Sequence, residues 1–453
     1  MIYNSLLYII LFPLLFLLVY AVQGSTIKKY LLLVISYTLY CYYNQQLVAI
    51  LLLVTLISYG SAWIWDRKAK PGASKNLRKW MLSLSVIVTI LPLLFYRHAL
   101  VAPLGISFFT FQALSYLFDV YRGKYPAERN LANYALYVAF FPSVIAGPIN
   151  RRYDALKPQF LHLARPDYQA MAKGLKMILW GMFLKTVIAD RLLLYVNPVL
   201  DNYQQHSGSE LLTASVLYSI QLYTDFAGYS LLAIGSAAML GIRLQQNFYN
   251  PYFATCITDF WHRWHISLSQ WLRDYIYIPL GGNRCSKGRT YLNILITFLV
   301  SGIWHGANWT FLVWGALHGA FQAAEKALGI AKKTCPSQVR WKRRSIRLIQ
   351  ILITFGLINL FWIFFRMPSI SDALAVIQRI FTEQDMHFWV FEKFIVIFIA
   401  MAFIKDLIDE IRPELNPFHH PKAWVRWASY LIVATSICLF GVFDAGQFIY
   451  AGF

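Results

Sequence analysis

The sequence predicts an all-helical integral membrane protein that crosses the bilayer many times. Of its 453 residues, 58% are apolar or aromatic and 14% are charged, and the mean hydropathy is +0.49. A helix that crosses the hydrocarbon core needs about 20 apolar residues. Several apolar runs reach that length, whereas shorter ones predict tilted, broken or re-entrant helices. We therefore expect a bundle with about 11 spans.

The apolar runs succeed one another along the whole chain with short connections between them. The first run is followed by Lys28 and Lys29 and has no positive charge before it, the reverse of a secretory signal, so it is expected to remain as a span. The runs cover 2–22, 30–43, 47–65, 80–96, 103–118, 131–149, 177–189, 211–241, 291–304, 309–324, 348–365, 394–404 and 424–443.

The net charge of +20 comes from basic residues in the connections, which is typical of membrane topology rather than of a nucleic-acid-binding protein. The connections 66–79 and 332–347 are rich in Lys and Arg and are expected in the cytoplasm. The connections 197–210 and 382–393 carry almost no basic residues and are expected outside. Counting back through three spans places the N-terminus outside.

Residues 1–453 are expected to form a single membrane domain, because no soluble domain, linker or internal repeat interrupts them. We divide it into N-terminal spans (1–102), a catalytic core (103–319) and C-terminal spans (320–453). Ionisable groups inside a membrane are costly and mark function by default. The core holds most of the polar residues found in apolar surroundings, namely Gln112, Asp119, Asp225, Asp259, His262, His265, Asn293, His305, Asn308 and His318.

The stretch 301–309 interrupts two apolar runs with glycines, a histidine and an asparagine, which predicts a kinked helix boundary. Trp304 and Trp309 can wall a cavity. His305 can act as a general base toward a hydroxyl group, because the ordinary pKa of histidine lies near neutrality. A structural histidine that is hydrogen-bonded to a neighbouring helix is the alternative, and the spacing alone leaves both open.

The segment 258–275 is too polar to span and too aromatic for an ordinary loop, which predicts an amphipathic helix at the interface or beside a hydrated tunnel. Arg263 and Arg273 can hold a phosphate or carboxylate of a charged donor, or can extend toward lipid headgroups. His262 and His265 have a spacing that permits metal binding, but no third ligand is evident, so no metal site is expected.

Other segments leave two interpretations open. The glycine pair 281–282 can seat phosphate oxygens on its backbone amides or form a plain turn. Asp225 either pairs with an arginine or orients a catalytic group. The proline- and glycine-containing stretches 103–112 and 140–149 indicate a lined cavity. The five scattered cysteines indicate neither a disulfide framework nor a zinc site.

Together these segments resemble the membrane-bound O-acyltransferase superfamily, and within it the bacterial alginate O-acetyltransferase-like branch. The resemblance is close over 103–319 and loose elsewhere. The segments that carry it are Gly147-Pro148, 225–229, Asn247-Phe248, 260–268, 279–284 and 304–309.

The resemblance implies a helical membrane fold with a central tunnel, a cytoplasmic acyl thioester as donor and a hydroxyl acceptor at the outer face. His305 matches the family's catalytic histidine, and His265 matches a second histidine near the tunnel. An amide such as that of Asn308 can stabilise the oxyanion. The residues expected to bind substrate or donor are Arg263, Trp304, Trp309, Asp225 and Arg273.

Departures from the family pattern are few. His262 replaces the usual arginine, and the C-terminal end 450–453 lacks the further residues common in relatives. The D-alanyl branch, which loads teichoic acids, lacks the 281–284 stretch and the continuation at 307–309, so acetyl is favoured over D-alanyl.

We therefore expect an O-acetyltransferase of the bacterial inner membrane that moves acetyl from cytoplasmic acetyl-CoA to an extracytoplasmic polysaccharide such as alginate, cellulose or peptidoglycan. A periplasmic partner of the SGNH-hydrolase type is expected, and no cofactor besides the donor. A transporter, whose buried polar residues form a substrate path, is the main alternative. A structural scaffold is the third.

Overall fold

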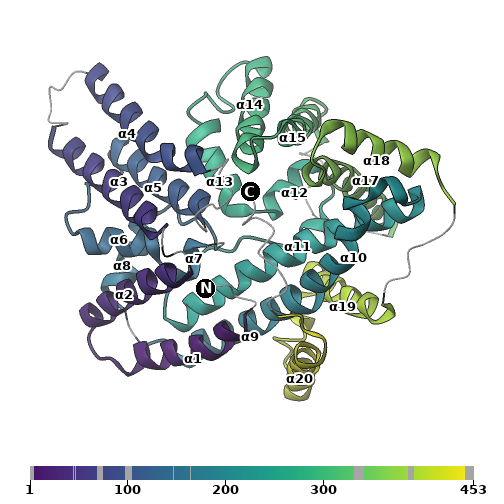
Figure 1. The fold of residues 1–453 in the computed structure, drawn as a ribbon, viewed down its shortest axis with the longest axis horizontal. Coiled ribbons are helices and arrows are strands. Elements are labelled where there is room, and N and C mark those ends of the chain that lie inside the picture. The colour runs from purple at the N-terminus through teal and green to yellow at the C-terminus, as the bar shows by residue number, and fades with distance from the viewer. Residues whose placement is uncertain are drawn as a thin grey trace. The chain divides into compact units, whose positions relative to one another are not determined.

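The computed structural model is helical throughout the residues that it describes, and it contains no strand among them (Figure 1). These residues are 5–43, 45, 47–68, 75–96, 105–145, 147–163, 165–330, 341–385 and 392–443. The chain divides into two compact units: unit 1 comprises 1–181, 229–246 and 447–453, and unit 2 comprises 182–228 and 247–446. Three of the boundaries fall inside the predicted core 103–319, and the single membrane domain stays a prediction.

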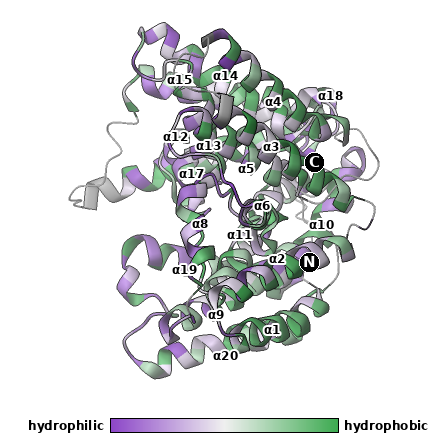
Figure 2. Ribbon diagram, turned by 90° about the vertical axis from the view of Figure 1, so that its left-hand side faces the viewer, coloured by the Kyte–Doolittle hydropathy of each residue, from purple (hydrophilic) through white to green (hydrophobic). Residues whose placement is uncertain are grey.

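Unit 1 begins with α1, which is hydrophobic over almost its whole length (Figure 2). Its first turn is capped by Ser5, whose hydroxyl accepts from the Tyr8 N–H at 3.2 Å. In this unit α5 packs against α3 and α4, and α6 packs against α2. Its helices are α1 (Leu6–Ala21), α2 (Ser25–Tyr43), α3 (Val48–Lys68), α4 (Lys75–Tyr96), α5 (Ile106–Tyr121), α6 (Leu131–Ala139), α7 (Phe141–Val144), α8 (Tyr153–Leu161) and α9 (Tyr168–Met182, whose last residue lies in unit 2).

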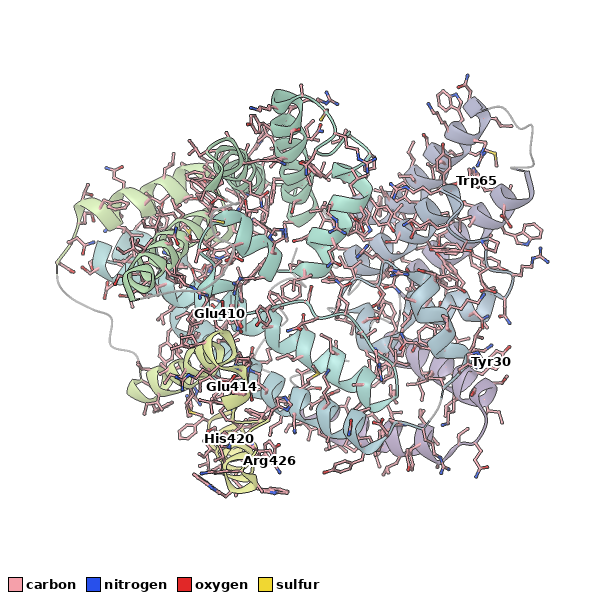
Figure 3. The ribbon with its side chains drawn as sticks, turned by 180° about the vertical axis from the view of Figure 1, so that it is seen from behind. Tyr30, Trp65, Glu410, Glu414, His420 and Arg426 are labelled. Atoms are coloured by element: carbon pink, nitrogen blue, oxygen red, sulfur yellow. The ribbon has the colours of Figure 1, made fainter. Side chains whose placement is uncertain are left out.

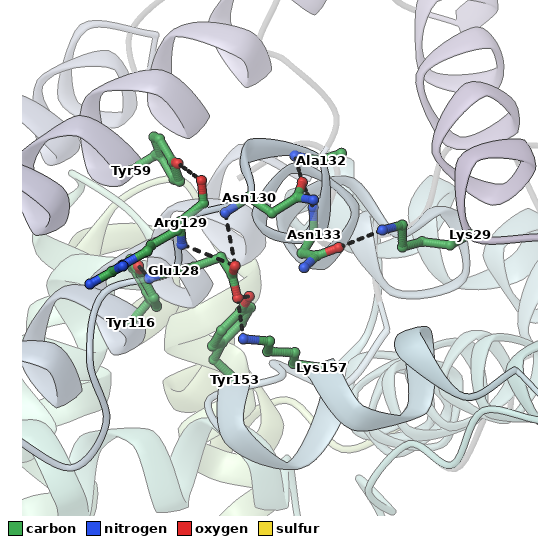
Figure 4. Close-up of polar contacts among 10 residues, drawn as sticks. All are labelled: Lys29, Tyr59, Tyr116, Glu128, Arg129, Asn130, Ala132, Asn133, Tyr153 and Lys157. Carbon is green, nitrogen blue, oxygen red and sulfur yellow. Dashed lines mark hydrogen bonds and ion pairs between the residues drawn. The ribbon is translucent and has the colours of Figure 1, made fainter. Parts of the chain in front are cut away.

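The connection from α5 to α6 is fixed by the buried carboxylate of Glu128 (Figure 4). This carboxylate accepts from the N–H groups of Arg129 at 3.0 Å and Asn130 at 2.8 Å. It also accepts from the Tyr153 hydroxyl at 2.6 Å and pairs with Lys157. Burial raises the pKa of Glu128, but the hydrogen bonds from Lys157 and Tyr153 outweigh it and hold this pKa below its ordinary value.

Unit 2 begins with a π-helix, η1, which carries a buried ion triad. The Lys185 ammonium lies 2.7 Å from Asp190 and 2.5 Å from Asp225, and all three side chains are 2% exposed. The sequence suggested an arginine as a partner of Asp225, and the partner is this lysine. The elements are η1 (Phe183–Ala189), α10 (Asp190–Asp201), η2 (Tyr203–Gln205), η3 (Pro251–Phe253), α12 (Ile257–Arg263), α13 (Ile266–Leu272), η4 (Arg273–Tyr277), α14 (Lys287–His305), α15 (Trp309–Ala327), α17 (Trp341–Arg366), α18 (Ile370–Thr382), α19 (Lys393–Ile411), η5 (Pro413–Leu415) and α20 (Ala423–Phe440); α11 (Gly208–Met239) begins in unit 2 and ends in unit 1.

Helices α14 and α15 form an antiparallel hairpin in which the backbones touch. A Cβ on Gly302 would lie 2.3 Å from the Phe311 carbonyl oxygen, and a Cβ on Gly315 would lie 2.4 Å from that of Phe298. Only glycine allows this approach. The predicted helix boundary at 301–309 is therefore the turn of a helical hairpin, with Gly306 ending α14 in an extended conformation.

Four described helices are long and apolar enough to cross a membrane, at Val48–Asp66, Asn76–Phe95, Ser345–Arg366 and Ala423–Phe440, and Leu6–Ala21 is a shorter apolar helix. Of the residues in the α4 span, 11% are buried within the protein, against 44% in the α17 span, so the protein covers much less of α4 than of α17. The prediction of a helical multi-pass membrane protein is confirmed. The number of about 11 spans and the tunnel stay predictions.

The segment 258–275 differs from the predicted amphipathic helix. It is broken into α12, α13 and η4, because His265 adopts φ +42° and interrupts the helix. Trp261, Leu268 and Leu272 are buried at 4%, 0% and 4% exposure, so this segment packs inside unit 2. His262 and Arg273 of the same segment are exposed, so one face of the segment is buried and another is open, and its place at the interface or beside a hydrated tunnel stays a prediction.

Several sequence predictions lie outside the described residues. They concern the start of the 103–112 stretch, most of the basic connections at 69–74 and 331–340, Cys335 and the C-terminal end at 450–453.

Candidate functional site

His305 lies at the C-terminal end of α14 in an aromatic cage within unit 2. The residue is buried, with 3% of its surface exposed. The centroid of its imidazole lies 4.6 Å from the ring of Trp304, 4.9 Å from that of Trp314 and 5.2 Å from that of Phe365. Aromatic residues from α14, α15 and α17 therefore surround the imidazole of His305.

His265, the second predicted histidine, lies against the same tryptophan. Its imidazole centroid is 6.0 Å from that of Trp304 and 4.6 Å from that of Phe226, and the residue is fully buried. The structure thus brings His265 and His305, which are 40 positions apart in sequence, to one indole ring. We call the set His265, Trp304, His305, Trp314 and His318 the histidine cluster.

His318 completes the histidine cluster from α15. Its Nδ1 accepts a hydrogen bond from the indole N–H of Trp261 at 3.0 Å, and its ring centroid lies 4.9 Å from that of Trp314. Because Nδ1 is the acceptor, the neutral ring carries its proton on Nε2. The sequence marked His318 as a buried polar residue but gave it no role.

A cavity of about 480 Å³ lies next to α12 in unit 2 and is bounded by α13, η4, α14 and α15. One wall is the ring of Trp261, which connects the cavity to the histidine cluster. The charged residues among its described lining are the basic Arg273 and Lys326, and none of these described residues is Asp or Glu. Its polar lining includes Thr258, His262, Gln270, Arg273, Gln322 and Lys326.

Two adjacent residues at the end of α15 contact two different segments that line this cavity. The Glu325 carboxylate accepts from the N–H of Ile257 at 2.6 Å, and from the N–H and hydroxyl of Thr258 at 2.8 and 2.7 Å. It therefore caps the N-terminus of α12. The neighbouring Lys326 ammonium reaches the Asn283 side chain and, at 3.3 Å, the Tyr277 hydroxyl. Neither residue was singled out from the sequence, because neither belongs to a recognisable motif.

The two predicted donor-binding arginines differ in their surroundings. Arg263 lies in ion pairs at 2.8 Å with Asp259 and at 2.8 Å with Glu410, which is labelled in Figure 3. It is absent from the described lining of the cavity. Arg273 does line the cavity, and its side chain is 56% exposed beside Asp274. Donor binding by either residue stays a prediction.

The predicted residues after His305 lie at the surface of unit 2. Asn308 is exposed, and its side-chain amide donates to the Pro368 carbonyl. Trp309 is 71% exposed, whereas Trp304 is 8% exposed. An oxyanion role for Asn308, a substrate role for Trp309 and the roles given to Trp304 and to the ion-paired Asp225 stay predictions.

The glycine pair forms a plain turn. The Gly281 N–H donates to the Ile278 carbonyl at 3.0 Å, and the Gly282 N–H donates to the Tyr277 carbonyl at 2.9 Å. Both glycines have positive φ, at +111° and +54°. The two amides close the turn and are not directed at the cavity.

The model of the MBOAT, membrane-bound O-acyltransferase, family matches residues 32–367. The probable alginate O-acetylase AlgI of Azotobacter vinelandii is 37% identical over 85% of this chain and 79% of its own length. The peptidoglycan O-acetyltransferase of Helicobacter pylori is 34% identical over 79% of this chain and 74% of its own length.

A more distant relative is the teichoic acid D-alanyltransferase of Streptococcus thermophilus, which is 27% identical over 70% of this chain and 82% of its own length. The family match covers the histidine cluster and the helices from α3 to α17, and the resemblance found in the sequence is confirmed. This multi-pass membrane protein is an enzyme, and it belongs to the membrane-bound O-acyltransferase family.

Proposed function

We propose that the protein is an O-acetyltransferase that draws acetyl from cytoplasmic acetyl-CoA and delivers it to a hydroxyl group of an extracytoplasmic polysaccharide. The observation that carries the proposal is the meeting of His265 and His305 at Trp304, in the unit that holds a positively charged cavity. Proton transfer and binding of an anionic donor are the two tasks of such an enzyme.

His305 is the proposed general base. An imidazole nitrogen of His305 takes the proton of the acceptor hydroxyl while the hydroxyl oxygen attacks the thioester carbonyl carbon. The resulting tetrahedral intermediate breaks its carbon–sulfur bond, and the thiolate receives the proton from the imidazolium. The products are an acetyl ester and free CoA thiol, and the histidine returns to its starting state.

The cavity is the proposed donor site. Its volume of about 480 Å³ lies within the range of about 300 to 1,000 Å³ typical of small-molecule sites. Arg273 and Lys326 supply positive charge toward which the phosphates of CoA would turn. His262, at the position of the family's usual arginine, also lines it.

Similarity favours acetyl over D-alanyl as the transferred group. The O-acetylating relatives are 34% to 38% identical, whereas the D-alanyltransferases are 26% and 27% identical. The relatives named for O-acetylation act on alginate or peptidoglycan according to their names, which supports a polysaccharide acceptor. We further propose an SGNH-type periplasmic partner, a location in the bacterial inner membrane and an N-terminus outside.

The test is release of CoA thiol and of labelled acetyl from radiolabelled acetyl-CoA by the purified protein in liposomes, with alginate and peptidoglycan fragments as acceptors. We expect full turnover by the wild type and by the control His162→Ala, whose histidine is exposed in unit 1, and turnover reduced by about 10²-fold or more in His305→Ala. Full activity of His305→Ala would remove the assignment of the base. Turnover with a D-alanyl thioester but not with acetyl-CoA would show that the transferred group is D-alanyl and not acetyl.

A further inference from the structure

The imidazole of His265 is held by a residue that has no role in the sequence-based predictions. The Nδ1 atom of His265 lies 3.2 Å from the side-chain oxygen of Asn247. Asn247 is fully buried in unit 2, ahead of α12. Its contacts therefore act on His265 without competition from bulk water.

The identity of the contacting atom of Asn247 follows from its other partners. The same oxygen accepts from the backbone N–H of Ser267 at 3.1 Å and from the Ser267 hydroxyl at 2.9 Å. A backbone N–H can only donate, so the amide of Asn247 must present its oxygen to this side. A carbonyl oxygen cannot donate, so Nδ1 of His265 is the donor and carries a proton. In the neutral ring the basic nitrogen is then Nε2.

The backbone of the same segment is strained. His265 has φ +42° in the left-handed region, which costs energy for a residue with a Cβ. The main-chain carbonyl of Asn247 accepts from the N–H of Ile266 at 2.9 Å, so Asn247 binds the segment through both its backbone and its side chain. Strain of this kind persists where the surroundings over-determine the conformation, and it is common at catalytic sites.

The remaining faces of the imidazole are packed. The ring of Phe226 meets it nearly perpendicularly at 4.6 Å between centroids, and the ring of Trp304 lies at 6.0 Å. Because Asn247 holds the ring at Nδ1, rotation of the ring by a half turn about its Cβ–Cγ bond would bring the carbon atom Cδ2 to Asn247 and break this hydrogen bond. The ring orientation is thus set by one asparagine.

We propose that Asn247 is a positioning residue that keeps His265 as the Nδ1–H tautomer, so that its unprotonated Nε2 can accept a hydrogen bond from the acceptor hydroxyl beside Trp304 while His305 takes the proton. The assignment of acyl transfer to this site rests on the proposed function. The tautomer of His265 does not rest on the proposed function, so the tautomer and the acyl transfer can be tested separately.

The kinetic experiment compares Asn247→Leu, Asn247→Asp and the control Ser267→Ala in the liposome assay. Leucine removes the acceptor at similar volume, and we expect kcat to fall about 100-fold or more, since an imidazole in the wrong tautomer presents an N–H group where the wild type presents the lone pair of Nε2. Aspartate keeps an acceptor and adds a charge that favours the imidazolium, so activity should be retained at high pH while the acidic limb of the kcat–pH profile moves to higher pH. Ser267→Ala keeps the bond to Nδ1 and should leave the profile in place.

The same comparison decides between positioning and mere structural support. If Asn247→Asp left the pH profile unmoved, or if folded Asn247→Leu kept wild-type kcat, the proposal would be overturned. Should the leucine variant fail to fold, the aspartate and Ser267→Ala profiles still give the answer.

A second readout does not require turnover. In protein labelled with ¹⁵N in its histidine rings, the resonances that are absent from the spectrum of His265→Gln identify the ring of His265. In the wild type we expect these resonances to have the chemical shifts of an Nδ1-protonated imidazole. In Asn247→Leu we expect these shifts to change. Shifts of an Nε2-protonated ring in the wild type would overturn the proposal. Absence of CoA release by the wild type, with the expected tautomer present, would instead contradict the proposed function alone.

Discussion

The histidine cluster and the cavity lie on either side of Trp261, and they differ in almost every physical respect. The imidazoles of the cluster are buried among aromatic rings, and two of them have a fixed hydrogen-bond partner in Asn247 or Trp261. The cavity instead presents cationic side chains that are exposed, such as Arg273 at 56%. A dry, rigid region suits proton transfer at fixed positions, and an open, charged one suits recognition of an anionic donor.

The largest expected effect is the loss of kcat in His305→Ala. General-base catalysis contributes about 10²- to 10⁴-fold, so we expect kcat to fall by that factor while KM for acetyl-CoA changes less than about twofold. Steady-state CoA release in liposomes measures both constants. A raised KM with unchanged kcat would instead assign His305 to donor binding. The histidine cluster and the cavity would then not differ in function.

The next effect concerns Glu325, which holds α12 between the two regions. Glu325→Ala leaves the N–H groups of Ile257 and Thr258 without their carboxylate acceptor, which should lower the free energy of unfolding by about 2 kcal/mol. Thermal unfolding in detergent, followed by intrinsic fluorescence, measures this. The control is Glu414→Ala, because Glu414 is exposed (Figure 3). Equal midpoints for the two variants would show that α12 does not depend on its cap.

A smaller effect is expected for Trp261→Phe, which keeps an aromatic wall for the cavity but removes the hydrogen bond to His318. We expect a loss of about 1 kcal/mol of stability, with KM for acetyl-CoA nearly unchanged. Trp424→Phe is the matched control, because Trp424 is 69% exposed and lies in α20, away from the cavity lining. A larger change in KM than in stability would make Trp261 primarily a part of the donor site.

The smallest effect is expected for the cations of the cavity. Arg273→Ala and Lys326→Ala should each raise KM for acetyl-CoA about fivefold with little change in kcat, since an exposed charge pair contributes about 1 kcal/mol. The difference from the wild type should shrink at high salt. Arg289→Ala, an exposed α14 residue outside the cavity lining, should behave as the wild type. A fall in kcat in the cavity variants would show that the cavity takes part in the chemical step as well as in donor binding.

The sequence was sufficient for features that depend on neighbours along the chain. Apolar runs predicted the spans at α3, α4, α17 and α20, and the Gly-rich stretch around His305 predicted a helix boundary. The motifs also predicted that His305 and His265 belong to one site, and the structure places both at Trp304.

Features that depend on distant partners could not be predicted. Asp225 is paired with Lys185 of a π-helix, and Arg263 is neutralised by Glu410, which lies 147 positions away. The break at His265 opposes local helical spacing, because tertiary hydrogen bonds to Asn247 outweigh it. Glu325 had no signal other than its position near the end of an apolar helix.

The close packing at Gly302 and Gly315 has a consequence for the length of the donor. It makes α14 and α15 a single stiff rod, with His305 at one end of the hairpin and Lys326 near the other. At 1.5 Å per residue, the 17 positions from Trp309 to Lys326 span about 25 Å. A donor that is held by its phosphates near Lys326 must extend over a comparable length for its thioester to meet His305, and a thioester with a shorter arm would dock without reacting.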